Sequence, residues 1–440
     1  MNMEIDGVPK PVCKYGSLCY RKNPDHLAGF SHPWQGKKLT KNSEPKKETS
    51  PTEKQNRNHP SSEKVKPKEV TESQCKDKEK RFQDTTDSSP GGSIPPSKKS
   101  KQSHDPDELL EAPDLSSEPD LPSFLKIEDE IKQKFLVSMP PDFFQFWEFC
   151  RSIDSKNPHD ALKPTKLKPV GPFDLMSGKL EKLGCRKLSP YLRHYRFYYD
   201  PPEFQTVLVE EGEDGYHIGY WRDEPDSPPA FLASNIVSKG GHFSITGENI
   251  FAAIHLYLKK KLDEASPFDK APIQKLISRI EKLAGEKELS LSETTSNTRA
   301  RLKNVIAKPF HGLGMVVPYN KKSQLGYREI PETTASLKKL MKKIVEARSE
   351  KELESGHDAM QELVTNVQFA NDEGDPGMGL ELGLNAFTSG GSQLHSYIKH
   401  LLGVAYELLG RPKFSQIIQA HLVYRRHGVH VSIEDELKRK

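Results

Sequence analysis

Apolar residues recur at helical spacing in several segments between about residues 121 and 431. The clearest segment is 336–348, where five apolar residues fall at positions i, i+3, i+4, i+7 and i+8. Similar patterns predict helices at 127–139, 141–153, 246–262, 358–373, 394–409 and 414–422. A hairpin is predicted where 204–209 and 216–221 flank the turn sequence Glu-Gly-Glu-Asp-Gly. Few strands and many helices predict an α+β, mainly helical, two-lobed large domain over residues 121–431.

Residues 35–120 show no such pattern and are dominated by lysine, glutamate, serine and proline. From Trp34 to Ser103 the chain carries 17 lysines and arginines against 10 aspartates and glutamates, and the sign reverses over 105–120. So few large apolar residues cannot bury enough surface to offset chain entropy. We therefore predict a disordered charged linker at 35–120, between the large domain and a small unit at 10–34.

Composition excludes several classes of protein. The chain has 440 residues, of which 34% are hydrophobic, and no run approaches the ~18 apolar residues of a membrane span. Five cysteines, an odd number and widely spread, argue against a disulfide scaffold. A net charge of +4 is too small to imply nucleic-acid binding. We expect a monomer with no membrane contact and no sequence-specific DNA binding.

The N-terminal unit carries a complete set of potential zinc ligands in the spacing C-x5-C-x6-H-x5-H. The ligands are Cys13, Cys19, His26 and His32. Two thiolates and two imidazoles form a closed tetrahedral site, so the predicted Zn²⁺ is structural and supplies the folding free energy of the unit. Six residues between the second cysteine and first histidine leave no room for the recognition helix of DNA-reading fingers. The alternative is a coincidental spacing in a disordered tail.

Two carboxylates, Asp372 and Glu373, end the helix predicted at 358–373. At ~100° per residue each lies roughly 130° from the apolar stripe of that helix, so neither is expected in its core. Gly374 and Pro376 stop the helix, and its dipole disfavours acidic groups at the C-terminal end. Acidic residues at a position that the helix dipole disfavours can indicate a functional site. On these residues alone, an ordinary solvated helix end remains the stronger interpretation.

The N-terminal unit resembles the poly(ADP-ribose)-binding zinc finger, whose pattern is C-x-[FY]-G-x-x-C-x-[RK]-x4-H-x3-[FY]-x-H. Every position of the pattern matches residues 13–32. The resemblance implies that Tyr15 and Tyr20 stack against adenine and that Arg21 contacts polar groups of ADP-ribose. Aromatic faces and guanidinium groups suit purines and phosphates, respectively. The alternative is that these three residues only support a small zinc fold.

The large domain resembles the histone PARylation factor family. The sequence segments that match the family, in the same order along the chain, are 142–150, 308–314, 326–333, 367–373 and 377–383. Members of this family do not bind NAD alone. The resemblance implies that the chain docks on the catalytic domain of a DNA-damage-activated poly(ADP-ribose) polymerase, which binds the NAD, and completes its active site. The chain would then have no activity by itself.

The resemblance also assigns roles to single residues. Glu373 would act as the general base that removes the proton from an acceptor serine, and Asp372 would contact the polymerase. Arg328 would engage the C-terminal region of the polymerase, although an ordinary surface salt bridge is the alternative. Tyr327 is as consistent with the core as with the interface.

Two functions remain open. In the first, the chain directs ADP-ribosylation to serine on histones and other chromatin proteins, in the nucleus at DNA breaks. In the second, it is a non-catalytic poly(ADP-ribose) reader that recruits partners. The lysine-rich segment 95–101 is consistent with a nuclear import signal, or equally with a solvated linker.

Overall fold

The computed structural model describes Ser31, residues 112–123 and residues 126–439. The predicted ligands and ADP-ribose contacts of the finger, together with most of the predicted linker, therefore lie outside the described residues. Within the part of the chain that is described, no helix is long and apolar enough to cross a membrane.

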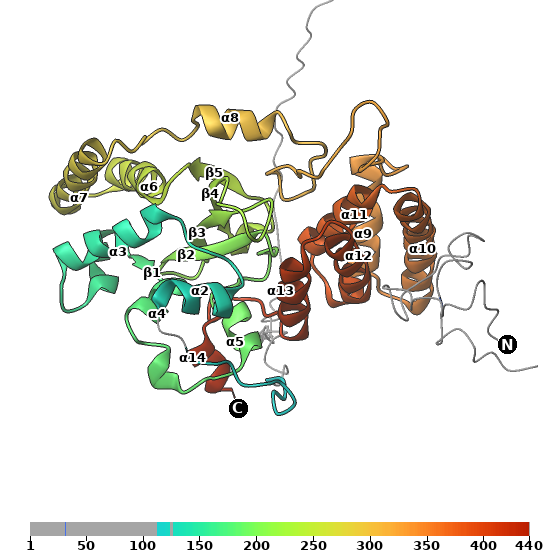
Figure 1. Cartoon of the computed structure of the whole chain (residues 1–440), viewed down its shortest axis with the longest axis horizontal. Helices are drawn as coiled ribbons and strands as arrows, with labels where there is room; N and C mark the ends of the chain where they lie inside the picture. Colours follow the sequence, from blue (N-terminus) through green and yellow to red (C-terminus); the bar gives the residue numbers. More distant parts are fainter. Residues whose placement is uncertain (1–30, 32–111, 124–125, 440) are drawn as a thin grey trace, which may run out of the picture. The chain divides into compact units, whose positions relative to one another are not determined.

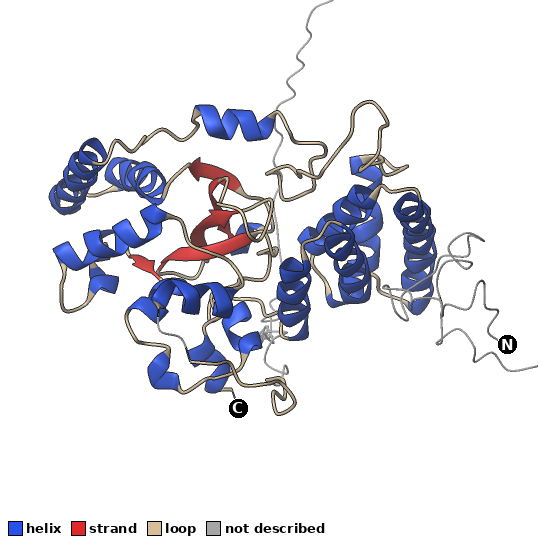
Figure 2. Cartoon of the chain, viewed as in Figure 1, coloured by secondary structure: helices blue, strands red, loops and turns tan. Residues whose placement is uncertain are grey.

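Five antiparallel strands form one sheet, in which their spatial order follows the chain. They are β1 (Leu167–Pro169), β2 (Phe204–Glu210), β3 (Tyr216–Trp221), β4 (Phe231–Ile236) and β5 (Ser244–Gly247), shown in red in Figure 2. The predicted hairpin is confirmed as β2 and β3, with Phe204 opposite Trp221. Our prediction missed β1, β4 and β5, and the sequence of β4 does not alternate between apolar and polar residues as a half-exposed strand does.

Helices surround this sheet. They are α2 (Ile127–Phe135), α3 (Pro141–Ile153), α4 (Pro172–Met176), α5 (Leu188–Arg193), α6 (Ile250–Glu264), α7 (Pro267–Glu286), α8 (Ser296–Leu302) and α14 (Ile433–Leu437). Short 3-10 turns are η2 (Pro158–Asp160), η3 (Lys163–Thr165), η4 (Glu181–Leu183), η5 (Val237–Lys239) and η6 (Ser392–Leu394).

Three of these helices, α2, α3 and α6, were predicted, and the other five were not. Two of the three differ from the predicted ranges. Helix α2 ends before the predicted residue 139 because Leu136 adopts the left-handed conformation, with φ of 59°. Helix α6 begins at Ile250 and not at 246, since residues 246–247 belong to β5. The side chain of Asn249 caps α6 by accepting a hydrogen bond from the N–H of Ala252 at 3.0 Å.

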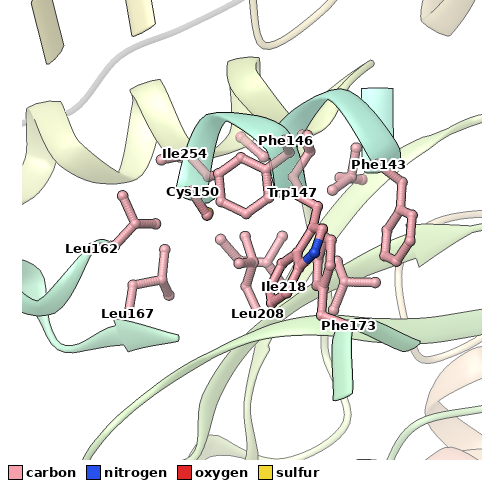
Figure 3. Packing of buried hydrophobic residues seen from close by; sticks show 14 of the residues in the cluster. Phe143, Phe146, Trp147, Cys150, Leu162, Leu167, Phe173, Leu208, Ile218 and Ile254 are labelled. Carbon is pink, nitrogen blue, oxygen red and sulfur yellow. The ribbon is translucent and has the colours of Figure 1, made fainter. Parts of the chain in front are cut away.

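The aromatic segment 141–153 forms α3 with the predicted bounds and packs into the first hydrophobic core. Figure 3 shows Phe146 in the same cluster as Leu208 of β2. Phe143 stacks on Phe173, with a ring-centroid distance of 4.0 Å. The aromatic face of α3 therefore anchors this helix against the sheet and α4.

A second core lies within a bundle of helices that pack in succession, coloured orange to red in Figure 1. The helices are α9 (Thr334–Val345), α10 (Glu350–Asp372), α11 (Pro376–Ser389), α12 (His395–Leu408) and α13 (Pro412–Val423). Four of them confirm predicted helices, although α10 begins earlier than predicted. Its start is set by Ser349, whose hydroxyl accepts the N–H of Glu352 at 3.3 Å. The sheet, the bundle and their separate cores confirm the α+β class.

Helix α11 was not predicted, because its glycines lower the intrinsic helix propensity of the segment. Packing explains why one of them is present. A Cβ atom added to Gly383 would lie 2.5 Å from Cδ2 of Leu402, so α11 approaches α12 more closely than a larger residue would allow. Tertiary packing here outweighs local propensity.

The acidic stretch before the predicted domain start at residue 121 also contacts the domain. The backbone N–H of Leu121 donates to the carbonyl oxygen of Arg186 at 2.7 Å. Glu118 accepts the N–H of Ser189 at 2.8 Å, and Lys187 lies 2.9 Å from Asp120. The acidic end of the linker is therefore bound by a basic segment of the domain.

Polar contacts also connect the bundle with the region of the sheet. Glu203, just before β2, accepts a hydrogen bond from the hydroxyl of Tyr406 in α12 at 2.8 Å. Arg411 forms an ion pair with Glu224 at 2.6 Å. Burial raises the pKa of Glu203 to about 7, although the hydrogen bond from Tyr406 and the charge of Arg411 oppose the shift.

We predict that the free energy of unfolding of Glu203→Gln rises relative to that of the wild type as the pH increases from 4.5 to 8. Unfolded Glu203 ionises near its ordinary pKa of 4.5, whereas the folded group ionises near 7. The folded chain therefore holds the proton longer, and stability falls as the pH rises through this window, by about 3 kcal/mol in total. Urea unfolding of both proteins from pH 4.5 to 8 measures the difference. A difference that does not vary with pH would contradict the prediction.

Candidate functional site

The turn between α10 and α11 carries the predicted carboxylates. Helix α10 ends at Asp372, Glu373 is its C-cap residue, and Gly374 takes the left-handed conformation with φ of 93°. The N–H of Glu373 donates to the carbonyl oxygen of Phe369 at 3.1 Å, which completes the last helical turn. Asp372 and Glu373 are both exposed, as the position of each relative to the apolar stripe predicted.

Arg328 reaches this turn from the segment that precedes α9. Its Nη2 atom is hydrogen-bonded to Oε2 of Glu373 and lies 3.1 Å from Oδ2 of Asp375. The hydrogen bond with Glu373 raises the pKa of Arg328 above its ordinary value, so the guanidinium stays charged. The structure thus brings together two predicted site residues, Arg328 and Glu373, that are far apart in the sequence. Both side chains remain largely exposed, at 46% and 58%.

Asp375 is a contributor to this arrangement that the sequence analysis did not single out. Only 4% of its side chain is exposed. One carboxylate oxygen accepts the N–H of Gly326 at 2.9 Å while the other pairs with Arg328. The sequence could have indicated a structural role for Asp375, because it directly precedes Pro376 at the start of a helix. Aspartate is common at that position as a helix cap. The side chain caps no N–H of α11 and instead binds the segment that carries Arg328.

Gly326 fixes the path of that segment. Its φ of 112° suits glycine, and a Cβ atom there would overlap the carbonyl oxygen of Pro318. The carbonyl oxygen of Gly326 accepts the N–H of Gly377 at 3.0 Å. Two hydrogen bonds therefore hold residue 326 against the start of α11, and Arg328 follows two residues later.

Tyr327 is half-buried, and its interface role stays a prediction. Its ring packs against the bundle core, and its hydroxyl donates to Oε2 of Glu381 at 2.8 Å. Burial raises the pKa of Tyr327, and the Glu381 carboxylate raises it further. In the free chain, Tyr327 helps to hold residues 326–328 on α11.

Two exposed apolar side chains border the acidic turn. Phe369, one turn before Glu373, is 58% exposed, and Leu325 is 49% exposed. Leu325 lies beside Gly374, since a Cβ atom there would be 3.8 Å from Cδ2 of Leu325. The sequence signal for Phe369 was its position ~200° around the helix from the buried Val367, away from the apolar stripe. Two large apolar side chains are therefore exposed close to the charged turn.

Comparisons with known proteins identify the family of this domain. The family profile of Histone PARylation factor 1 matches residues 126–425. The chain belongs to the histone PARylation factor 1 family. A second profile, that of the PBZ domain, matches residues 10–35, where the sequence analysis predicted the zinc finger.

Curated relatives extend over most of this domain. Histone PARylation factor 1 of Bos taurus is 42% identical over 315 residues, which are 70% of this chain and 89% of that protein. The protein of the same name from Mus musculus is 43% identical over 312 residues, with the same coverage. That of Danio rerio is 41% identical over 302 residues, 68% of this chain and 86% of that protein.

The PBZ match supports a zinc site in the finger of this family member. The donor set of Cys13, Cys19, His26 and His32 fits Zn²⁺, which favours thiolate and imidazole ligands in a closed tetrahedral shell. Tyr15, Tyr20 and Arg21 remain predicted ADP-ribose contacts, because they lie outside the described residues. Among the described residues, no group of three or more histidines, cysteines, aspartates and glutamates could hold a metal ion.

We predict that Asp375→Ala loosens the segment that carries Arg328. The change removes the acceptor of the Gly326 N–H and the buried carboxylate beside Arg328, at a cost of about 1–3 kcal/mol in the free energy of unfolding. Urea unfolding and hydrogen exchange at the Gly326 amide measure the two effects.

Asp375→Asn is the matched variant, since its amide oxygen can still accept the Gly326 N–H while the charge is lost. We expect it to retain most of the protection of that amide. Equal stability and equal exchange for wild type and Asp375→Ala would show that Asp375 does not hold the segment.

Proposed function

We propose that this chain completes the active site of a DNA-damage-activated poly(ADP-ribose) polymerase and directs ADP-ribosylation to serine on histones and other chromatin proteins in the nucleus. The observation that carries the proposal is the exposed turn where Glu373 and Arg328 meet beside two apolar side chains. An exposed carboxylate at a helix end has little chemistry of its own. Covered by a partner that binds NAD, it becomes a base in a site without bulk water.

In the proposed reaction, Glu373 takes the proton of the acceptor serine hydroxyl. The serine oxygen attacks the C1 atom of the nicotinamide-bound ribose, and the bond from that carbon to the nicotinamide nitrogen breaks. Nicotinamide leaves with the electron pair and becomes neutral. A serine hydroxyl is a poor nucleophile without a positioned base, and such bases contribute typically 10²–10⁴-fold to a rate.

We propose that the guanidinium of Arg328 exchanges one carboxylate partner for another when the chain docks. In the free chain its guanidinium is bonded to Glu373 and Asp375. We infer that a carboxylate in the C-terminal region of the polymerase takes the place of Glu373 on docking, which frees the Glu373 oxygens for the serine proton. Asp375 is buried and stays in place, so it keeps Arg328 near the turn during this exchange.

Asp372, Phe369 and Leu325 supply the remaining docking surface in this proposal. The two apolar side chains would lose their solvent exposure against the polymerase, and an exposed aromatic residue is a typical anchor of an interface. Asp372 would add a charged contact at the rim. Tyr327 acts from behind this surface through its hydrogen bond to Glu381.

The PBZ finger would act as a tether in this function. By binding poly(ADP-ribose) already made at a DNA break, it raises the local concentration of the large domain across the linker. The finger needs Zn²⁺ for its fold, whereas the serine chemistry resides in the large domain and uses NAD bound by the polymerase.

We predict that Glu373→Gln lowers serine modification of a histone peptide by at least about 100-fold while docking is retained. The amide keeps the shape of the side chain but cannot take the proton. The measurement combines polymerase, DNA ends, NAD and peptide, with the modified amino acid identified by mass spectrometry and docking measured by titration.

Glu362→Gln provides the matched control, since Glu362 is exposed on the same helix α10. It should leave both measurements unchanged. Full serine activity of Glu373→Gln would remove the general-base role from Glu373.

The PBZ match favours one alternative function, a non-catalytic poly(ADP-ribose) reader that recruits partners to DNA breaks. Deletion of residues 1–40 distinguishes this alternative from the catalytic function. We predict that the truncated chain loses poly(ADP-ribose) binding but still supports serine transfer in solution. Loss of all activity on deletion would instead favour the reader.

A further inference from the structure

A tight basic turn lies directly before the segment that carries Arg328. Residues 321–324 form the turn, and Asn320 and Leu325 close it as an isolated bridge, with the Asn320 N–H donating to the Leu325 carbonyl oxygen at 2.9 Å. The side-chain oxygen of Asn320 accepts the backbone N–H groups of Lys322 and Ser323, at 2.9 and 3.3 Å. The turn therefore has a defined shape, set by its own hydrogen bonds.

Ser323 presents a hydroxyl to solvent from this turn. The residue is exposed, and its hydroxyl makes no hydrogen bond to any described residue, so it is not needed to close the turn. Lys321 and Lys322 precede it and are exposed as well. An accessible hydroxyl beside two positive charges is electrostatically suited to a site lined by Asp372 and Glu373.

The turn adjoins the docking surface of the same chain. Leu325, two residues after Ser323, lies beside Gly374, and the N–H of Gly326 is bonded to Asp375. Two residues span at most about 7 Å of chain, so Ser323 is close to the rim of the acidic turn. The closed bridge between Asn320 and Leu325 fixes the path of the turn next to this rim.

We propose that Ser323 is itself an acceptor, modified with ADP-ribose on an undocked chain by the joint site that another copy forms with the polymerase. This proposal rests on the serine transfer proposed above. The Ser323 oxygen forms the bond to ribose C1, its proton passes to Glu373 of the catalysing copy, and nicotinamide leaves with the electron pair of the broken bond. NAD on the polymerase supplies the ADP-ribose, so no further reactant is needed.

Modification of Ser323 would switch off docking of the modified chain. ADP-ribose on Ser323 would add a large group two residues from Leu325, one of the apolar side chains that the polymerase would contact. Its diphosphate would also bring negative charge to the rim that Asp372 and Glu373 already make negative, and like charges brought together across an interface weaken binding. The number of chains able to dock would then fall as the reaction proceeds.

The test uses a tagged Glu373→Gln full-length chain as acceptor, mixed with the wild-type chain, polymerase, DNA ends, NAD and a histone peptide. We expect ADP-ribose on Ser323 of the tagged copy, and none when the wild-type chain is omitted. Ser292, exposed in a loop without adjacent lysines, is the internal control and should stay unmodified.

Modification of the peptide but not of Ser323 would overturn this inference and leave the proposed function standing. Modification of neither would overturn the proposed function itself. ADP-ribose on Ser323 of the wild-type copy alone would contradict transfer between copies.

A second measurement tests the effect on docking. Wild-type and Ser323→Ala chains are each preincubated in the full reaction, purified, and titrated with fresh polymerase. We expect the modified wild-type chain to bind at least about tenfold more weakly than Ser323→Ala, while the initial rates of the two before preincubation are equal. Equal affinities after preincubation would overturn the switch.

Discussion

The buried carboxylate of Asp375 is the contact on which the geometry of the site depends. It joins two parts of the chain that are separate in sequence, the turn after α10 and the segment before α9, through one hydrogen bond to a backbone N–H and one ion pair. The exposed residues that face solvent contribute little rigidity of their own, since surface ion pairs are worth little in water. Because Asp375 is buried, its hydrogen bond to the Gly326 N–H is shielded from water, whereas the Arg328 end of the ion pair remains exposed. The exposed acid and its guanidinium partner are therefore placed by a residue that is itself buried.

Much of the fold follows from periodic patterns that the sequence displays openly. The amphipathic stripes of α9, α10, α12 and α13 and the aromatic face of α3 predicted those helices, because each buries one side against a core. What failed had a different cause in each case. Helix α11 contains glycines where it packs closely on neighbouring segments, such as Gly383 against α12, and the residues of β4 do not alternate between apolar and polar. Both features are set by tertiary neighbours and leave no local signal.

The site was only partly predictable from the sequence. The exposure of Asp372 and Glu373 follows from helical geometry, since their angular positions lie off the apolar stripe. The pairing of Glu373 with Arg328 does not follow from any local pattern, because it depends on how the 326–328 segment crosses the start of α11. Nor could spacing show that Asp375 turns away from its own helix. The zinc ligands are the opposite case, since their chemistry can be inferred from residue types and spacing alone.

The left-handed glycine at 326 has a consequence for how this region can vary. Gly326 fixes the position of the backbone at this point, because both its N–H and its carbonyl oxygen are hydrogen-bonded to the start of α11. Its Cα atom also packs closely against the carbonyl group of Pro318. Insertions or deletions in the preceding turn, up to Leu325, would change the length of that turn without shifting the register of the arginine that follows. Beyond the glycine, a single added residue would rotate the guanidinium away from both acids. The length of the chain can therefore change before Gly326 without moving Arg328, whereas the length after Gly326 is fixed.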